Sequence, residues 1–175
     1  RGGKRPEIEG AISTAFGCTL QGNVPEDEVV RLAVALAEFC EGVALADTVG
    51  YANPAQVRRV FRRVKQEIGD KLEGAHFHNT RGLGLANALA AYEEGVRSFD
   101  SSMGGLGGCP FAPGASGNVI TEDLVFMFES MGVATGIDFE KLLAARNIMH
   151  GGVPDEPLYG HMALAGLPKG FRAAA

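Results

Sequence analysis

The sequence predicts an α/β fold built on a parallel sheet. Short β-rich segments at 10–16, 42–46, 73–78 and 96–101 alternate with helical patterns at 25–39, 54–68, 85–94 and 121–131, and a last helix covers 139–150. This alternation is typical of successive βα units, whose crossovers make neighbouring strands parallel. Four units fit either half of an eight-stranded barrel or a small open doubly wound sheet. No G-x-G-x-x-G follows the first strand, so the pattern does not support a dinucleotide-binding sheet.

Local signals mark the ends of the helices. Asn23 is a candidate cap for the first helix, and Asn53 followed by Pro54 opens the second. Gly69 provides the stop of the second helix. Asp138 is placed to cap the last helix, and the chain from residue 151 onward has little periodicity.

Composition excludes several classes of function. The 175 residues are 46% hydrophobic and 21% charged, as in an ordinary globular protein, and the formal net charge of -5 gives no electrostatic case for nucleic acid or an anionic membrane. No apolar run reaches the ~18 residues that a membrane-spanning helix needs. The three cysteines show no disulfide framework, and no secretory-type leader is evident, so we expect a reducing compartment.

His76 and His78 form the sharpest local motif. Side chains two residues apart on a strand point to the same face, so both imidazoles would enter the end of the sheet. Two neutral imidazoles at this spacing can chelate one divalent ion. The alternative is a pair of histidines hydrogen-bonded in a polar barrel end.

Two further polar residues follow predicted strands. Asp47 closes the second strand, where its carboxylate could orient substrate, act as a base or support a metal ligand; it could equally cap the turn that Gly50 completes. Asn118 precedes the helix at 121–131, and its amide oxygen could be a hard metal ligand, although an ordinary turn Asn fits as well.

A glycine-rich loop carries the third feature. Its glycines, Gly104, Gly105, Gly107 and Gly108, precede Cys109. Four glycines let the backbone approach a ligand closely. A cysteine on such a loop is expected to be accessible, unlike Cys18 and Cys40, which we assign to packing.

Together these residues resemble the hydroxymethylglutaryl-CoA lyases, within the wider DRE-TIM metallolyase group. The matching stretches are Ala-Asp-Thr-Val-Gly at 46–50, His-Phe-His at 76–78, Asp-Ser-Ser-Met-Gly-Gly-Leu-Gly-Gly-Cys-Pro-Phe at 100–111, Ala-Ser-Gly-Asn at 115–118 and Thr-Glu-Asp-Leu at 121–124. The Gly-Leu-Gly-Gly-Cys-Pro loop is specific to the lyases, whereas His-x-His is shared by the group.

The resemblance implies a fold and a reaction. The fold is a (β/α)8 TIM barrel, of which this chain would carry about the last four βα units: 1–9 an unstructured or truncated start, 10–150 the C-terminal half of the barrel with a terminal helix, and 151–175 an irregular tail. The implied activity is cleavage of 3-hydroxy-3-methylglutaryl-CoA, or a similar 3-hydroxyacyl-CoA, to acetyl-CoA and acetoacetate. A homo-oligomer in the cytoplasm or mitochondrial matrix is expected.

The resemblance also assigns roles. His76, His78 and Asn118 would bind Mg²⁺ or Mn²⁺, and Cys109 would be the catalytic cysteine. A thiol with a pKa of ~8.5 is protonated at neutral pH and can serve as the acid. His76 and Asp47 are both candidate bases.

Two departures from the family pattern bear on activity. Asn79 stands where the family usually has Asp after the second histidine, so an acidic partner of a metal ligand is missing. The Asp-Arg-Glu signature of the first barrel strand, which supplies a further metal ligand, has no equivalent before Gly10. We therefore expect this chain to need the N-terminal half of the barrel and to be inactive alone. The alternatives are another DRE-TIM aldolase or Claisen-type synthase, a lyase for a different branched acyl-CoA, and a noncatalytic half-barrel module.

Overall fold

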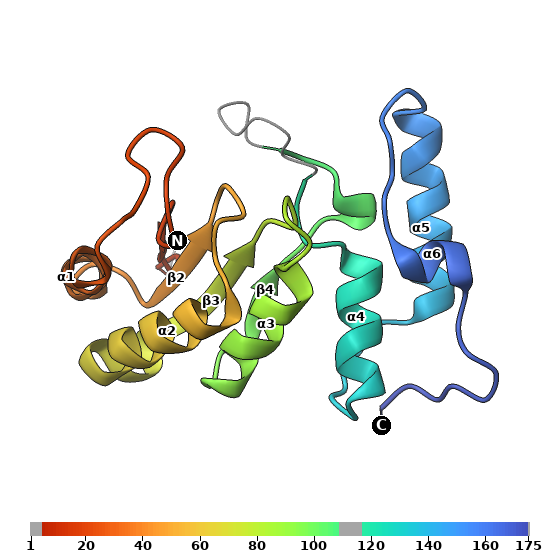
Figure 1. Cartoon of the computed structure of the whole chain (residues 1–175). Helices are drawn as coiled ribbons and strands as arrows, with labels where there is room; N and C mark the ends of the chain where they lie inside the picture. Colours follow the sequence, from red (N-terminus) through yellow and green to blue (C-terminus); the bar gives the residue numbers. More distant parts are fainter. Residues whose placement is uncertain (1–4, 109–116, 175) are drawn as a thin grey trace.

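Four parallel strands form one sheet with helices along one side of it (Figure 1). The computed structural model describes residues 5–108 and 117–174. In these residues the strands pair in sequential order and in parallel throughout, so the predicted βα units are confirmed. The elements of the sheet layer are β1 (Glu9–Ile12), α1 (Glu26–Ala37), β2 (Gly42–Asp47), α2 (Pro54–Ile68), η1 (Gly69–Lys71), β3 (Leu72–Phe77), α3 (Gly84–Glu93) and β4 (Ser98–Asp100).

A second group of elements follows the sheet: η2 (Met103–Gly105), α4 (Thr121–Ser130), α5 (Phe139–Gly152) and α6 (His161–Ala165). The helix α6 lies in the tail at 151–175, which was predicted to be irregular, so that prediction is wrong at this point. The Asp123 carboxylate accepts the backbone N–H groups of His161 at 3.0 Å and Met162 at 2.7 Å and thereby holds the first turn of α6. A contact across almost forty residues leaves no local signal in the sequence.

The two faces of the sheet differ in chemistry. The register places Asp47 beside Phe77 and Ala46 beside His76, and His76 beside Asp100. Because side chains alternate along a strand, Phe77 and Asp47 point to one face and His76 to the other.

The helix-covered face contains the core. Phe77 packs with Phe61 of α2 and with Phe16, with ring centroids 6.0 to 6.3 Å apart. Val57, Val60 and Val64 of α2 are fully buried in the same cluster. The opposite face, which carries His76, is therefore the one available for chemistry.

The start and stop signals of α2 are confirmed. The Asn53 side chain accepts a hydrogen bond from the Gln56 N–H at 3.0 Å, Pro54 occupies the first turn, and Gly69 is the C-cap. The predicted cap of α1 is wrong: Pro25 is the N-cap residue, and the Asn23 carbonyl instead accepts a hydrogen bond from the Gln21 side chain.

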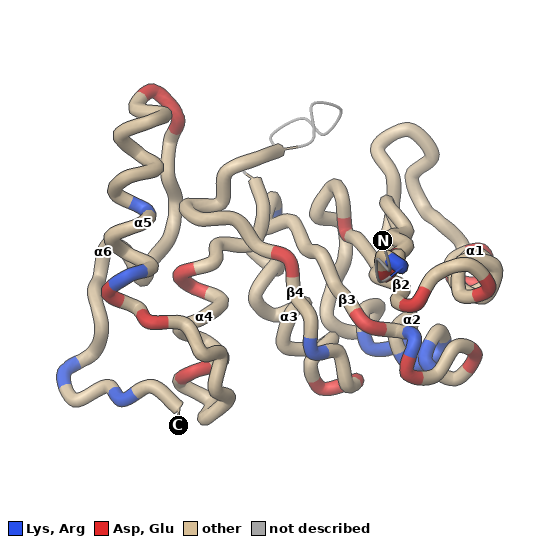
Figure 2. Tube along the Cα trace, turned by 180° about the vertical axis from the view of Figure 1, so that it is seen from behind, with Lys and Arg blue, Asp and Glu red and all other residues tan. Residues whose placement is uncertain are grey.

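Basic residues gather on α2, whereas acidic residues lie on α1 and at the end of α3 (Figure 2). Arg62 of α2 pairs with Glu94 at 2.5 Å, and Arg59 pairs with Glu26 of α1 at 2.9 Å. These pairs join neighbouring helices on an exposed surface, where each contributes about 0–1 kcal/mol. None of the described helices is both long and apolar enough to cross a membrane.

Candidate metal and catalytic site

The candidate site lies where β3 ends. The backbone at 117–119 runs antiparallel to the end of β3, because Val119 N–H donates to the Phe77 carbonyl and Asn79 N–H donates to the Gly117 carbonyl, each at 3.0 Å. An isolated bridge pairs His78 with Asn118. The structure thus brings together two predicted metal ligands that are forty residues apart in the sequence.

His76 and His78 lie side by side, as their spacing predicted. Their ring centroids are 5.2 Å apart, with an interplanar angle of 65°. The His76 side chain is 28% exposed, and its Nδ1 is 3.6 Å from a carboxylate oxygen of Asp100. Asp100 is itself 73% exposed, so this contact is weak, and His76 remains accessible from the open face of the sheet.

His78 is the buried member of the pair. Burial lowers the pKa of its imidazole, and the neighbouring His76 lowers that pKa further. A neutral imidazole is the form that binds a metal ion. Its Nδ1 is buried and has no hydrogen-bond partner among the residues that the structure describes.

The Asn118 carboxamide is fixed in one orientation. Its Nδ2 donates to the Leu106 carbonyl at 2.8 Å and to the Gly107 carbonyl at 3.2 Å. With the amide nitrogen held by two carbonyls, Oδ1 must point the other way, and this buried oxygen has no partner within the described part of the chain. Two buried atoms that lack partners cost free energy unless a ligand satisfies them.

These residues fit a divalent cation. The free amide oxygen is a donor type of hard ions such as Mg²⁺ and Mn²⁺, and the free imidazole nitrogen is a donor type of divalent transition-metal ions. Across residues 5–108 and 117–174, His, Cys, Asp and Glu form no group of three that could hold a metal. A metal site in this part of the chain would therefore need Asn118 as a third ligand beside His76 and His78.

Asp47 points away from the histidines. Its carboxylate is fully buried and accepts the N–H groups of Tyr51 at 2.8 Å and Ala52 at 3.1 Å, so it caps the turn after β2. Burial raises the pKa of Asp47, against the effect of these two hydrogen bonds and of the nearby Arg81. The sequence left open whether Asp47 acts in the site or caps the turn after β2, and the geometry shows that it caps the turn. A catalytic role for Asp47 stays a prediction.

Two other predicted features are placed as follows. The Asn79 carboxamide oxygen accepts the Gly84 N–H at 3.0 Å, at the start of α3, so this side chain is engaged with the helix. The glycine loop is described as far as Gly108, and its residues at 105–108 border a small cavity of about 140 Å³ shared with Glu156, Pro157 and Tyr159. Cys109 lies outside the described residues.

Two polar groups near the site were not predicted from the sequence. Arg81 donates to the carbonyls of Val49 at 3.1 Å and Gly50 at 3.2 Å and lies over the Tyr51 ring, which braces the turn that Asp47 caps. Glu122, in the first turn of α4, is fully buried although it carries a carboxylate. The hydrophobic pattern of α4 gave no sign that an acidic residue would be buried there.

The sheet order, the helices on one face and the polar cluster at the carboxyl ends of the strands define part of a (β/α)8 barrel, in which the loops after the strands form the active site. A family model described as HMGL-like matches residues 8–149. The chain belongs to this family, and the predicted fold class is confirmed.

Two curated relatives are equally similar to this chain. The hydroxymethylglutaryl-CoA lyase YngG of Bacillus subtilis is 48% identical over 135 residues, which are 77% of this chain and 45% of the relative. The (R)-citramalyl-CoA lyase of Chloroflexus aurantiacus is 48% identical over 136 residues, which are 77% of this chain and 43% of that protein. The matched part of the chain thus covers less than half the length of these relatives.

Solved structures agree with this assignment. The HMG-CoA lyase of Acinetobacter baumannii, in complex with coenzyme A and 3-methylmalate, superposes with a TM-score of 0.85 at 44% identity, covering 95% of this chain and 55% of that one. The carboxyl transferase domain of Rhizobium etli pyruvate carboxylase gives a TM-score of 0.68 at 19% identity, covering 93% of this chain and 28% of that one, which shows a shared fold alone.

Proposed function

We propose that the complete protein is a divalent-metal-dependent lyase that cleaves 3-hydroxy-3-methylglutaryl-CoA, or a close 3-hydroxyacyl-CoA, to acetyl-CoA and a keto acid. One observation carries the metal part of this proposal. The buried His78 Nδ1 and Asn118 Oδ1 both lack partners among the described residues, and a backbone bridge pairs the two residues with each other. The names of the relatives support the acyl-CoA lyase part.

In this proposal His76, His78 and Asn118 hold the cation. When bound, the ion supplies positive charge that stabilises an oxyanion on the substrate. The residues around it exclude water from His78 and keep its imidazole neutral. Asn118 presents only its oxygen, because its Nδ2 is occupied by two loop carbonyls.

The reaction is a retro-Claisen cleavage with two proton transfers. A base removes the proton from the substrate hydroxyl, the carbon–carbon bond breaks, and its electron pair becomes the enolate of acetyl-CoA, which an acid then protonates. Of the two candidate bases, Asp47 is buried on the other face of the sheet, and His76 can take the proton only while its lone pair is not bound to the cation. Cys109 remains the expected acid.

The acyl group is the open part of the proposal. The relatives named for hydroxymethylglutaryl-CoA and for (R)-citramalyl-CoA are both 48% identical to this chain. Both names denote CoA thioesters, so we propose that one of these two is the substrate.

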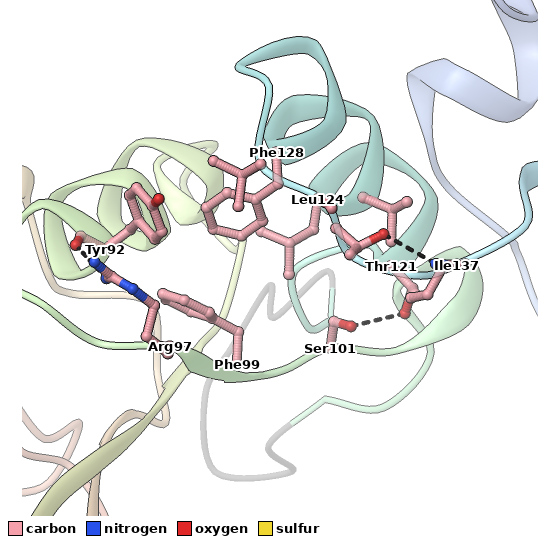
Figure 3. A pocket seen from close by; sticks show the side chains of 12 residues that line it. Tyr92, Arg97, Phe99, Ser101, Thr121, Leu124, Phe128 and Ile137 are labelled. Atoms are coloured by element: carbon pink, nitrogen blue, oxygen red, sulfur yellow. Dashed lines mark hydrogen bonds between the residues drawn. The ribbon is translucent and has the colours of Figure 1, made fainter. Parts of the chain in front are cut away.

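We also propose that activity needs the missing part of the barrel. The described strands β1 and β4 are the edges of the sheet, and β4 borders a cavity of about 340 Å³ (Figure 3). Its lining includes the apolar side chains of Phe99, Leu124 and Phe128, beside the hydrogen-bonded hydroxyls of Ser101 and Thr121. An open strand edge next to apolar side chains is a place where a further strand can pair. The N-terminal half of the barrel would supply that strand, and a homo-oligomer remains the expectation.

The test is an activity assay of the complete barrel with both CoA thioesters. We expect turnover that EDTA abolishes and that Mg²⁺ or Mn²⁺ restores. Asn118→Ala should lower kcat/KM by at least about 100-fold, because loss of a residue that only orients a metal ligand already costs about 10–100-fold. Asn147→Ala, which changes an exposed Asn on α5, is the matched control and should leave it unchanged. Full turnover in EDTA, or full activity of Asn118→Ala, would contradict the metal assignment.

A further inference from the structure

A buried ion pair lies beside the candidate site but is not part of it. Glu122 of α4 is fully buried, and the side chain of Arg146 of α5 is 12% exposed. Their closest atoms, Oε1 and Nη1, are 2.7 Å apart. A buried pair of this kind gains little stability over apolar residues of the same size, because both charges lose their hydration. Its partners indicate what else it does.

Glu122 contacts Gly104 at the start of the glycine loop, and Arg146 contacts Tyr159 in the C-terminal tail. The two carboxylate oxygens of Glu122 accept the Gly104 N–H at 3.2 and 3.1 Å. Arg146 Nη1 also donates to the Tyr159 carbonyl at 2.9 Å, and the Tyr159 N–H donates to the Gly104 carbonyl at 2.8 Å. The N–H and C=O of Gly104 are therefore both held, one by α4 and the other by the C-terminal tail.

The same loop segment holds the Asn118 carboxamide. The carbonyls of Leu106 and Gly107, two and three residues after Gly104, accept the two hydrogen bonds from Asn118 Nδ2. Backbone hydrogen bonds join the segment before the glycine loop to the segment that carries Asn118. The Ser102 N–H donates to the Val119 carbonyl at 3.1 Å, and the Thr121 N–H donates to the Ser102 carbonyl at 3.0 Å. Displacement of Gly104 would thus move the carbonyls that orient Asn118.

We propose that Glu122 and Arg146 are positioning residues that clamp Gly104 to the C-terminal tail and thereby aim the Asn118 carboxamide oxygen into the metal site. The clamp itself stands on the hydrogen bonds above, and only its consequence for metal binding rests on the proposed function. It gives the tail after the barrel a part in the site, through the hydrogen bonds of Tyr159 to Gly104 and Arg146.

The first experiment measures backbone hydrogen exchange by mass spectrometry, on the purified protein that carries this whole chain. Arg146→Met removes the contacts to Glu122 and Tyr159 and should raise exchange in peptides spanning 102–107 by at least about tenfold, as loss of charge-assisted hydrogen bonds does. Arg58→Met is the matched control, because it removes an Arg from the exposed 2.6 Å pair with Glu93, and it should leave these peptides unchanged.

A second variant covers the case in which Arg146→Met does not fold, since it leaves Glu122 buried without a counter-charge. The double variant Glu122→Gln with Arg146→Met is neutral and should fold, and it should show the same local rise in exchange. Unchanged exchange at 102–107 in the folded variants would overturn the proposal. An equal rise in β2 and β3 would overturn it too, because the pair would then only stabilise the whole fold.

The second readout is Mn²⁺ affinity by calorimetry. We expect the double variant to bind Mn²⁺ at least about tenfold more weakly than the parent protein, and unchanged affinity would overturn the link to Asn118. If the parent protein itself binds no Mn²⁺, the proposed metal function fails. Hydrogen exchange at 102–107 still decides whether the clamp exists, so the two failures are distinguishable.

Discussion

Gly104→Ala is predicted to destabilise the fold more than the same change at another glycine with similar backbone angles. Gly104 has φ 62°, and an alanine Cβ there would lie 2.9 Å from both Arg146 Nη1 and Leu158 Cδ2. Gly132, after α4, has φ 79°, and a Cβ there would meet nothing within 4 Å. The two variants therefore share the backbone strain and differ in the steric contact.

The magnitudes follow from these two terms. A left-handed backbone costs a residue with a Cβ about 1–2 kcal/mol. Loss of glycine from the unfolded chain returns about 0.4–1 kcal/mol in both variants. The steric contact adds about 1–3 kcal/mol at position 104 alone, because one guanidinium is held by two hydrogen bonds and cannot move away freely. The free energy of unfolding should thus differ between the variants by about 1–3 kcal/mol.

Urea denaturation of both variants, followed by circular dichroism, measures this difference directly. Equal slopes of the two unfolding curves would show that the denatured states are comparable. A difference below about 0.5 kcal/mol, the usual error of such comparisons, would refute the reasoning. It would mean that Arg146 and Leu158 yield without cost and that Gly104 is not clamped.

Three further predictions concern the site and the core. The pKa of His78 is lower in the folded chain than in the unfolded chain, so the unfolded chain binds the proton first as the pH falls. The free energy of unfolding should therefore fall as the pH drops below about 6.5 and through the folded-state pKa. Thermal melting at a series of pH values measures this trend, which His78→Gln should weaken. Phe61→Ala should cost about 3–5 kcal/mol in urea titrations, because Phe61 is fully buried between Phe16 and Phe77; a cost under 1 kcal/mol would contradict that packing. Asn53→Ala should cost about 1 kcal/mol in the same titration through loss of the α2 cap, and no change would show that the cap is dispensable.

The helix α2 shows why some boundaries can be predicted from sequence. Its cap, its first-turn proline and its terminal Gly69 are all neighbours in the chain, and each acts on the backbone of its own turn. The first strand shows the limit. It was expected over 10–16 but ends at Ile12, because the chain turns at Thr14, which has φ 55°. No local pattern around Thr14 predicts this left-handed conformation.

By itself, the sequence determined the order of strands and helices, the pairing of His76 with His78 on one face, and the resemblance that the family match confirmed. These depend on local periodicity and on short motifs. Only the tertiary structure decided that Asp47 turns toward the helices, that Asn118 lies beside His78, and that Glu122 is buried with Arg146. The physical reason is that burial, register and long-range hydrogen bonds depend on residues far apart in the chain, which no local pattern encodes.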